Sequence, residues 1–485
     1  MKKSSLRFVL TFFLMLPFLA DAQEEKQKYF PETDPLVLEK LEQWQDIKFG
    51  LLMHWGTYSQ WGIVESWSIC AEDEPWCRRP HDNYELYKQE YENLQTTFNP
   101  VNFDPSKWAT AAKRAGMKYM VFTTKHHDGF TMFDSKFTDY KITDPKTPFH
   151  TNPKANITKE IFDAFRTEDF MIGAYFSKPD WHSPYYWWKN FATPDRNVNY
   201  NVNTYPDRWE KFKDFTHGQV NELMSDYGKV DILWFDGGWV QPYTDEEILA
   251  YKVKKDFKQV SLQNQDIDMP RLVEEVRAKQ PGTIVVDRAV EGPYQNYITP
   301  ENRIPEHMIP YPWESPMIAG GSWSWIKKPN YISTRKAVHM LLDIVSKGGN
   351  LLLNIAPSPL GEFDEGAYEL LEGIGQWMDV NSEAIYETRP IAPYKEGKVT
   401  LTQNRHTKVV YAAYLPEENE NQPPTKIWLS TIQPEKGTKV TMLGSKVNLK
   451  WEAIGNGFEV IIPESLRKNP PASDAWVLKI EKVKD

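Results

Sequence analysis

The residues of this sequence that are best placed for chemistry stand where short apolar runs end. Asp236 follows the run at residues 232–235 and precedes two glycines. A carboxylate in that position can serve as a nucleophile if a second carboxyl group nearby holds a proton and works as acid and base. The other interpretation is a turn cap, because Asp-Gly pairs are common in turns. Asp236 is our candidate nucleophile.

Histidines end two other apolar runs. His54 follows residues 49–53, and His126 and His127 follow residues 118–125. Neighbouring strand residues point to opposite faces, so the pair is not expected to bind one metal ion, and no HExxH spacing accompanies it. We therefore predict no metal site and expect hydrogen bonds to substrate hydroxyls. The alternatives are that one histidine of the pair is structural and the other functional, and that His54 is a core histidine.

Six short apolar runs, separated by charged amphipathic segments, have to position these side chains. The runs are residues 49–55, 118–125, 170–177, 230–238, 283–289 and 349–357. Helix patterns lie between them, for example at 104–116, where Asp104 can cap the helix and Pro105 fits its first turn. Buried strands that alternate with helices predict a parallel sheet, either closed into a barrel or open.

Two features favour the barrel. No Gly-rich phosphate loop follows the first run, which argues against a nucleotide-binding open sheet. Polar residues end nearly every run, and barrel active sites collect at the carboxyl ends of the strands. These endings are His54, residues 125–128, Ser177, Asp236 and Arg288. The sequence therefore predicts an α/β fold with a (β/α)8-like TIM barrel.

The pattern changes after about residue 385. Residues 398–414, 425–432, 438–450 and 457–481 contain short β-prone runs separated by Pro, Gly, Asn and Glu. Such spacing is typical of an antiparallel sandwich. We therefore expect a catalytic domain at residues 23–385 and a C-terminal β-sandwich at residues 386–485.

Residues 1–22 have the pattern of a signal peptide. Basic residues come first, an apolar run follows, and an Ala-x-Ala site precedes Gln23. The apolar run is short for a membrane-spanning helix. We expect export to the periplasm or the outside of the cell, with no membrane insertion of the mature chain.

Composition narrows the choice of partners. The net charge of −10, with no long basic run in the mature region, argues against a nucleic-acid binder. Aromatic residues make up 14% of the chain, which suits either a large core or sugar recognition. Cys70 and Cys77 are close enough in sequence for a local disulfide after export, and two cysteines do not make a zinc site.

Several segments together resemble a known family. FGLLMHWGTYS, KYMVFTTKHHDGF, GAYFSKPDWH, VDILWFDGG and a late SWSW before GGNLLLNIAPSPLG are similar, in this order, to the α-L-fucosidases of glycoside hydrolase family 29. The resemblance covers about residues 48–360. It implies a (β/α)8-like barrel, a C-terminal β-sandwich, a retaining exo-α-L-fucosidase that works by double displacement, no cofactor, and fucosylated oligosaccharides or glycoconjugates as substrates.

The resemblance also implies roles for residues. It makes Asp236 the nucleophile. The substrate-binding residues that it implies are His54, Glu65, Trp67, His126, His127, Tyr175, Trp234, Arg288 and Trp323. Trp323 falls where an aromatic ring packs against the fucose methyl group. The motif usually reads SWGY or SFGY, so this chain departs from it at Ser324 and Trp325.

The acid/base is the role on which family members differ most. Glu301 in YITPE is the preferred candidate, because members tend to place this residue in the loop before the WE motif. Glu314 in PWES is the second candidate and could instead orient the pocket. Glu291 and Glu306 are weaker alternatives.

Two other functions fit the same residues. One is a glycosidase on the same scaffold for a related sugar such as α-L-galactose, which differs from fucose only at carbon 6. The other is a catalytically silent carbohydrate-binding protein. The sequence supports no prediction of the oligomeric state.

Overall fold

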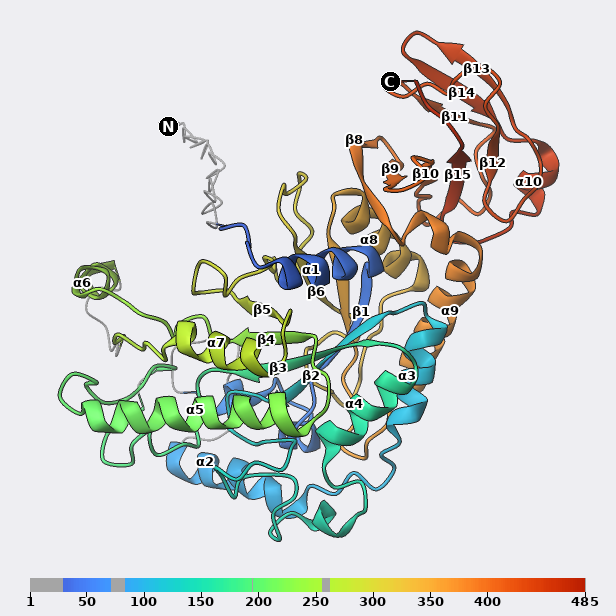
Figure 1. Ribbon diagram of the computed structural model, residues 1–485. Helices are drawn as coiled ribbons and strands as arrows, with labels where there is room; N and C mark the ends of the chain where they lie inside the picture. Colours follow the sequence, from blue (N-terminus) through green and yellow to red (C-terminus); the bar gives the residue numbers. More distant parts are fainter. Residues whose placement is uncertain (1–28, 71–82, 194, 255–261, 485) are drawn as a thin grey trace, which may run out of the picture.

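The fold is described from a computed structural model (Figure 1), which describes residues 29–70, 83–193, 195–254 and 262–484. The predicted signal peptide and Cys77 lie outside these residues, so the signal peptide and the disulfide between Cys70 and Cys77 stay predictions. Cys70 is buried. Within the described ranges, no helix has the length and apolar character needed to cross a membrane.

A parallel sheet forms the centre of the N-terminal part, as the apolar runs predict. Its strands are β1 (Phe49–Met53), β2 (Tyr119–Lys125), β3 (Met171–Ser177), β4 (Ile232–Asp236), β5 (Ile284–Asp287), β6 (Glu314–Ile318) and β7 (Asn350–Asn354), in the spatial order β5-β4-β3-β2-β1-β7-β6. Strands β1, β2 and β7 are buried at every position. Continuous burial explains why these runs are apolar throughout instead of alternating.

The sheet curls into a TIM-like half-barrel that lacks one regular strand. An irregular segment fills the space between β5 and β6: Asn296 N–H donates to the Val285 carbonyl, and Glu314 N–H donates to the Ile298 carbonyl, both at 2.9 Å. The predicted fold class is therefore confirmed, with seven regular strands in the described part of the barrel instead of eight.

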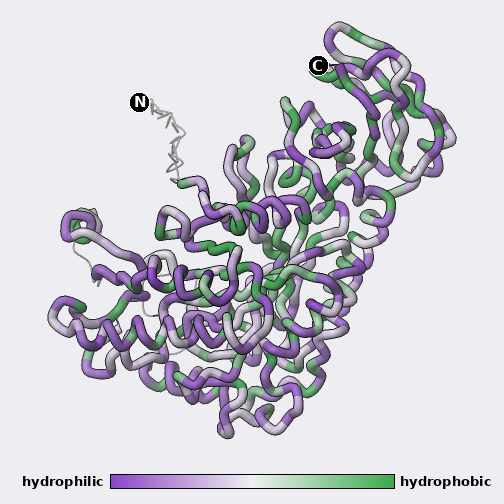
Figure 2. The backbone as a smooth tube through the Cα atoms, viewed as in Figure 1, coloured by the Kyte–Doolittle hydropathy of each residue, from purple (hydrophilic) through white to green (hydrophobic). Residues whose placement is uncertain are grey.

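The helices of the N-terminal part lie around the curled sheet, and α6 (Asp245–Lys254) lies furthest from it (Figure 1). They are α1 (Pro35–Ile47), α2 (Tyr84–Glu92), α3 (Pro105–Arg114), α4 (Ile157–Thr167), α5 (Pro206–Asp226), α6 (Asp245–Lys254), α7 (Met269–Lys279), α8 (Thr334–Ser346) and α9 (Glu365–Asn381). Pro105 opens α3 as predicted, but the predicted cap is wrong, because the Asp104 side chain makes no hydrogen bond to the helix. Figure 2 shows apolar residues alternating with polar ones along these outer helices.

The C-terminal part consists of two antiparallel sheets. One contains β8 (Thr388–Glu396), β9 (Val399–Asn404), β10 (Val410–Tyr414), β12 (Val440–Met442) and β15 (Trp476–Ile480); the other contains β11 (Lys426–Leu429), β13 (Lys450–Ile454) and β14 (Gly457–Ile461). A short helix, α10 (Glu464–Lys468), precedes β15. Apolar residues from both sheets, such as Leu401 and Phe458, share one core. This arrangement confirms the predicted C-terminal β domain.

Charged residues fasten this domain to the barrel. Arg389 Nη1 lies 2.8 Å from Asp46 Oδ1, and Arg405 Nη2 lies 2.9 Å from Asp46 Oδ2. Both arginines also contact the Glu42 carboxylate of α1. These ion pairs lie near the amino end of β1, so they do not cover the face of the barrel where the strands have their carboxyl ends.

Candidate active site

A cavity of about 650 Å³ opens where the strands of the barrel end. It brings together the predicted nucleophile, the preferred acid/base and every predicted substrate-binding residue. These are His54, Glu65, Trp67, His126, His127, Tyr175, Trp234, Asp236, Arg288, Glu301 and Trp323. Side chains from six strands or the loops after them therefore converge on one space, as expected for the carboxyl face of a barrel.

A larger cavity of about 890 Å³ lies between α8 and the C-terminal domain. Its charged side chains serve the domain contact: Arg335, for example, donates to the carbonyls of Glu417 and Glu418 at 2.8 and 3.2 Å. Because histidines, aromatic rings and carboxylates converge in the smaller cavity, we take that one as the candidate active site.

Asp236, the last residue of β4, lies at the centre of the hydrogen bonds in this cavity. Its Oδ2 accepts from the Tyr175 hydroxyl at 2.6 Å, and its Oδ1 accepts from Arg288 Nη2 at 2.5 Å and from Gly237 N–H at 2.7 Å. Burial raises the pKa of Asp236, but the charge of Arg288 and the Tyr175 hydrogen bond outweigh it and hold the pKa well below its usual range. The carboxylate is therefore ionised. Turn capping accounts for just one of its three hydrogen bonds.

Arg288 connects Asp236 with Glu301. Its Nη2 binds Asp236, while its Nη1 binds Glu301 Oε2. The Glu301 side chain is 42% exposed, so it lies at the open side of the cavity. The Arg288 guanidinium also lies 5.1 Å from the centre of the Trp234 ring. One guanidinium thus limits how far apart the two carboxyl groups can lie.

A buried ion pair fixes the backbone on both sides of Arg288. Lys178 Nζ lies 2.8 and 2.9 Å from the two carboxylate oxygens of Asp287, and both side chains are buried. The Lys178 N–H donates to the Asp236 carbonyl at 2.9 Å, and Asp287 Oδ1 accepts from Ala289 N–H at 3.0 Å. The pair therefore ties the ends of β3, β4 and β5 together and positions Arg288.

Glu314 lies beneath the cavity and does not line it. It is the first residue of β6, at the end of the strand away from the cavity, and it is fully buried. Its Oε2 accepts from the Tyr119 hydroxyl at 2.7 Å and its Oε1 from Trp234 Nε1 at 3.1 Å. Burial raises the pKa of Glu314 to about 7. This geometry favours the orienting role over the acid/base role for Glu314.

The raised pKa of Glu314 predicts a pH dependence of stability. Between its ordinary pKa of 4.5 and its folded value of about 7, the folded protein binds more protons at Glu314 than the unfolded chain does. This group therefore lowers the free energy of unfolding as the pH rises through that window. We expect Glu314→Gln to flatten the decline, which thermal unfolding from pH 4 to 8 can measure. An unchanged slope would contradict this.

Three histidine rings form one wall of the cavity, and all three are buried. The ring centres of His126 and His127 lie 4.2 Å apart, and those of His54 and His126 lie 5.8 Å apart. Burial lowers the pKa of His54 and of His127 to about 4, and it lowers the pKa of His126 well below its usual value. All three rings are therefore neutral at neutral pH.

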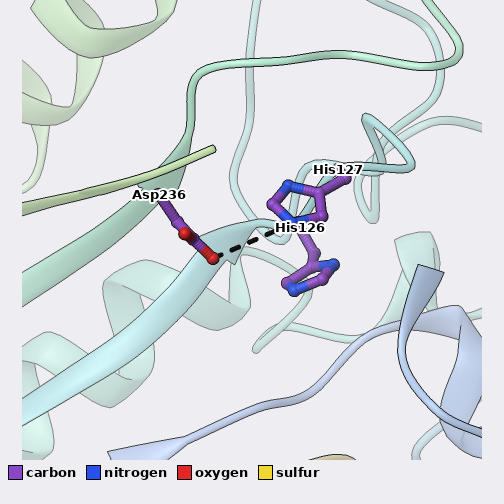
Figure 3. A group of neighbouring side chains, drawn as sticks. All are labelled: His126, His127 and Asp236. Carbon is purple, nitrogen blue, oxygen red and sulfur yellow. Dashed lines mark ion pairs between the residues drawn. The ribbon is translucent and has the colours of Figure 1, made fainter. Parts of the chain in front are cut away.

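The prediction that His126 and His127 point to opposite faces is wrong. Strand β2 ends at Lys125, and the chain turns over residues 126–129, where Gly129 has a φ of +82° and donates to the His126 carbonyl at 3.1 Å. The strand alternation therefore no longer applies. Figure 3 shows both rings on the same side, facing Asp236.

His126, His127 and Asp236 together have the types of side chain that can bind a metal ion. One ligand atom each from His126, His127 and Asp236 lies within 4.8 Å of the others. However, Arg288 and Tyr175 already bind the two oxygens of Asp236, and a metal ion would have to compete with the Arg288 cation. The donor set fits a neutral polar ligand better than a divalent cation.

Glu65 is a second buried carboxyl group in the cavity. Its Oε1 accepts from Ser324 N–H at 2.9 Å, and burial raises its pKa to about 8, so Glu65 is protonated at neutral pH. The Ser324 hydroxyl donates to the Ile63 carbonyl. Trp325 turns away and donates to Asp364 Oδ2 at 3.0 Å. The unusual residues of SWSW thus anchor the loop, and Trp323 is the SWSW tryptophan that lines the cavity.

Arg196 and Trp239 are polar or aromatic residues of the cavity wall that sequence reasoning missed. The Arg196 guanidinium lies 4.7 Å from the Trp67 ring centre and 5.1 Å from the Trp239 ring centre. Trp239 follows directly on the Asp236-Gly-Gly turn, so proximity to the candidate nucleophile could have identified it. Arg196 lies in an irregular loop, where no periodic pattern indicates which way a side chain points.

Comparisons with known proteins agree with this geometry. The family model described as Alpha-L-fucosidase matches residues 17–383, and the model described as Alpha-L-fucosidase C-terminal domain matches residues 394–481. An Alpha-L-fucosidase of Branchiostoma floridae is 28% identical over 478 residues, 94% of this chain and 96% of the relative.

Two further relatives cover nearly the whole chain. Tissue alpha-L-fucosidase of Homo sapiens is 28% identical over 497 residues, 97% of each chain. Among solved structures, Alpha-L-fucosidase isoenzyme 1 from Paenibacillus thiaminolyticus is similar with a TM-score of 0.73 and 28% identity, over 93% of this chain and 100% of that one. The motifs that suggested the resemblance therefore belong to a similarity over both parts of the chain.

Proposed function

The chain belongs to the α-L-fucosidase family of glycoside hydrolases, and on that premise we propose that it removes terminal α-L-fucose from fucosylated glycans by double displacement with retention. The observation that carries the mechanism is the Arg288 guanidinium, which binds the Asp236 and Glu301 carboxylates at once. Retaining glycosidases need their two carboxyl groups about 5–5.5 Å apart, whereas inverting enzymes hold them further apart. A shared guanidinium fits the shorter separation.

In the first step, Asp236 attacks the anomeric carbon and the bond to the leaving oxygen breaks. The carboxylate is suited to this role because Arg288 and Tyr175 keep it ionised and hold its orientation. Glu301 leaves Arg288, takes up a proton and gives it to the leaving oxygen. The exposure of Glu301 allows the rest of the glycan to leave toward solvent.

In the second step, water opens the fucosyl ester of Asp236. Glu301, now ionised, removes a proton from that water, and fucose leaves with its original α configuration. The three histidines stabilise the transition state if their hydrogen bonds to the ring hydroxyls tighten as positive charge develops on the sugar.

The walls of the cavity fit a 6-deoxy sugar. Trp323 lies 5.3 Å from the His54 ring, and Trp234, Leu52 and Ile318 add further apolar surface. The methyl group of fucose can pack on such a wall, whereas the hydroxymethyl group of α-L-galactose brings a hydroxyl into it. An apolar wall discriminates against one added hydroxyl by roughly 100-fold at most, so α-L-galactosides are the expected weak alternative substrates.

A direct assay tests the function. We expect hydrolysis of an aryl α-L-fucoside, a rate roughly 10–100-fold lower on the aryl α-L-galactoside, and α-fucose as the first product anomer in NMR spectra. β-Fucose as the first product would overturn the retaining mechanism. Binding of fucose without turnover of aryl or natural fucosides would point to the silent carbohydrate-binding protein.

Residues 1–22 support export to the periplasm or the outside of the cell, where fucosylated glycans are accessible. Mass spectrometry of the protein made in a Gram-negative host tests this: a mature chain starting at Gln23 is expected, and an uncleaved exported chain would contradict it.

A further inference from the structure

We propose that Ser177 and Asn354 are positioning residues that fix the proton positions of His127 and His54, so that both rings offer an unprotonated Nε2 to the cavity and accept hydrogen bonds from sugar hydroxyls. The proposal rests on the proposed function for the identity of the sugar. The direction of the hydrogen bonds to that sugar is argued only from hydrogen bonds that Ser177 and Asn354 make in the protein without ligand.

The proton position of His127 follows from its contact with Ser177. Its Nδ1 lies 2.6 Å from Ser177 Oγ, and the same hydroxyl lies 2.9 Å from the Pro179 carbonyl. A carbonyl oxygen can only accept, so the single hydrogen of Ser177 goes to Pro179. Ser177 Oγ then accepts from His127, whose proton is on Nδ1. A neutral imidazole carries one N–H, which leaves the lone pair on Nε2.

The proton position of His54 follows from its contact with Asn354. Its Nδ1 lies 2.9 Å from Asn354 Oδ1. Asn354 Nδ2 donates to the carbonyls of Trp323 and Ser322 at 2.8 and 3.4 Å. Rotating the amide by half a turn would place its oxygen against two carbonyls, so these contacts fix its orientation. Asn354 Oδ1 therefore faces His54 and accepts the Nδ1 proton, and Nε2 again keeps the lone pair.

Both rings line the cavity, and His127 Nε2 lies 3.8 Å from Asp236 Oδ2. Two acceptors that lie this close cannot bond to each other. A sugar hydroxyl carries one hydrogen, so the hydroxyl beside the reacting carbon can donate it to His127 Nε2, while Asp236 Oδ2 keeps its hydrogen bond from Tyr175. The arrangement therefore selects hydroxyl donors, and it leaves the Asp236 carboxylate without a competing donor from His127.

Asn354 has a second consequence. The amide that orients His54 also holds the backbone of Trp323, whose ring forms the apolar wall. The position of the hydroxyl-binding ring and the position of the wall are thus set by one side chain. We expect substitution of Asn354 to affect hydroxyl recognition and the choice between fucose and galactose together.

Nitrogen NMR of the free enzyme, labelled with ¹⁵N in its histidine rings, tests the proton positions without any substrate. We expect the Nε2 signals of His54 and His127 at the shift of unprotonated nitrogen and their Nδ1 signals at that of N–H. Loss of each signal set in His54→Gln and His127→Gln gives the assignment. Protonated Nε2 in either wild-type ring would overturn the proposal for that ring, whatever the hydrolysis assay shows.

Variants test the positioning role. Ser177→Ala should populate the Nε2–H form of His127 and lower kcat/KM by about 10–100-fold, the usual cost of losing an orienting partner. Ser177→Thr keeps the hydroxyl and should restore both the NMR signature and most of the activity. Ser346→Ala is the matched control, because Ser346 is also a buried serine but lies in α8, away from the cavity. It should alter neither the His127 spectrum nor the activity. An unchanged His127 spectrum in Ser177→Ala would refute the role of Ser177.

Asn354→Asp supplies the corresponding test for His54. The carboxylate still accepts from Nδ1–H, but it draws a second proton onto the ring, so the Nε2 signal should move to that of N–H near neutral pH. An unchanged Nε2 signal would refute the role of Asn354. Soluble, folded protein by circular dichroism is required of each variant, and Asn354→Gln is the second variant if the aspartate does not fold.

Discussion

Replacing Asp236 with alanine is expected to lower kcat/KM for an aryl α-L-fucoside by about 10⁴-fold or more, the scale on which removal of a nucleophile acts. Of the other carboxyl groups that line the cavity, Glu65 is protonated at neutral pH, because burial raises its pKa to about 8. Glu301 is bound at the other terminal nitrogen of Arg288. Neither can therefore take over the attack from the position of Asp236.

The stereochemistry of rescue gives the sharper readout. In Asp236→Ala, azide can enter the space of the carboxylate and attack the anomeric carbon directly, so the product should be β-L-fucosyl azide. Asp231→Asn is a matched control, because Asp231 lies just before the same strand at its other end, where it is buried and lies 2.6 Å from Lys40 Nζ. We expect the control to lose stability and keep its activity. Near-normal turnover by Asp236→Ala would disprove the assignment.

The strand ends can be predicted because a buried parallel strand appears in the sequence as a continuous apolar run. An apolar run that stops at a polar residue locates the carboxyl end of the strand, and His54, Asp236 and Arg288 were found in this way. The periodic rule failed where regular structure stopped. His126 lies one residue beyond β2, so the turn through Gly129, and not strand alternation, decides where its ring points.

Contacts between residues far apart in sequence could not be predicted. Glu301 and Glu314 both follow aromatic or Pro-rich segments, and only the register of β6 shows that Glu314 begins its strand below the cavity. The ion pair of Lys178 with Asp287 joins positions 109 residues apart. No local pattern predicts such a pair, although Lys178 lies within the motif GAYFSKPDWH and Asp287 within the apolar run at residues 283–289.

Replacing Glu301 with alanine should lower kcat/KM by about 10²–10⁴-fold on a fucoside with a poor leaving group, which needs a proton to depart. The dinitrophenolate group of a 2,4-dinitrophenyl fucoside departs without that proton, so the rate of the first step should fall much less with this substrate. The fucosyl ester of Asp236 should then accumulate, because the second step lacks its base. Azide, which needs no base, should attack this ester from the opposite face and give α-L-fucosyl azide.

Glu314→Gln is the decisive comparison for this assignment. Glu314 accepts from Tyr119 and Trp234 beneath the cavity, and glutamine keeps an acceptor there, so activity should stay within a few-fold of wild type. The two azide products then separate the roles: the β azide from Asp236→Ala marks the nucleophile, and the α azide from Glu301→Ala marks the acid/base. If Glu301→Ala kept full activity while Glu314→Gln lost it and regained it with azide, the proton would have to reach the leaving oxygen from below the sugar. The buried position of Glu314, at the start of β6, makes that route the harder one.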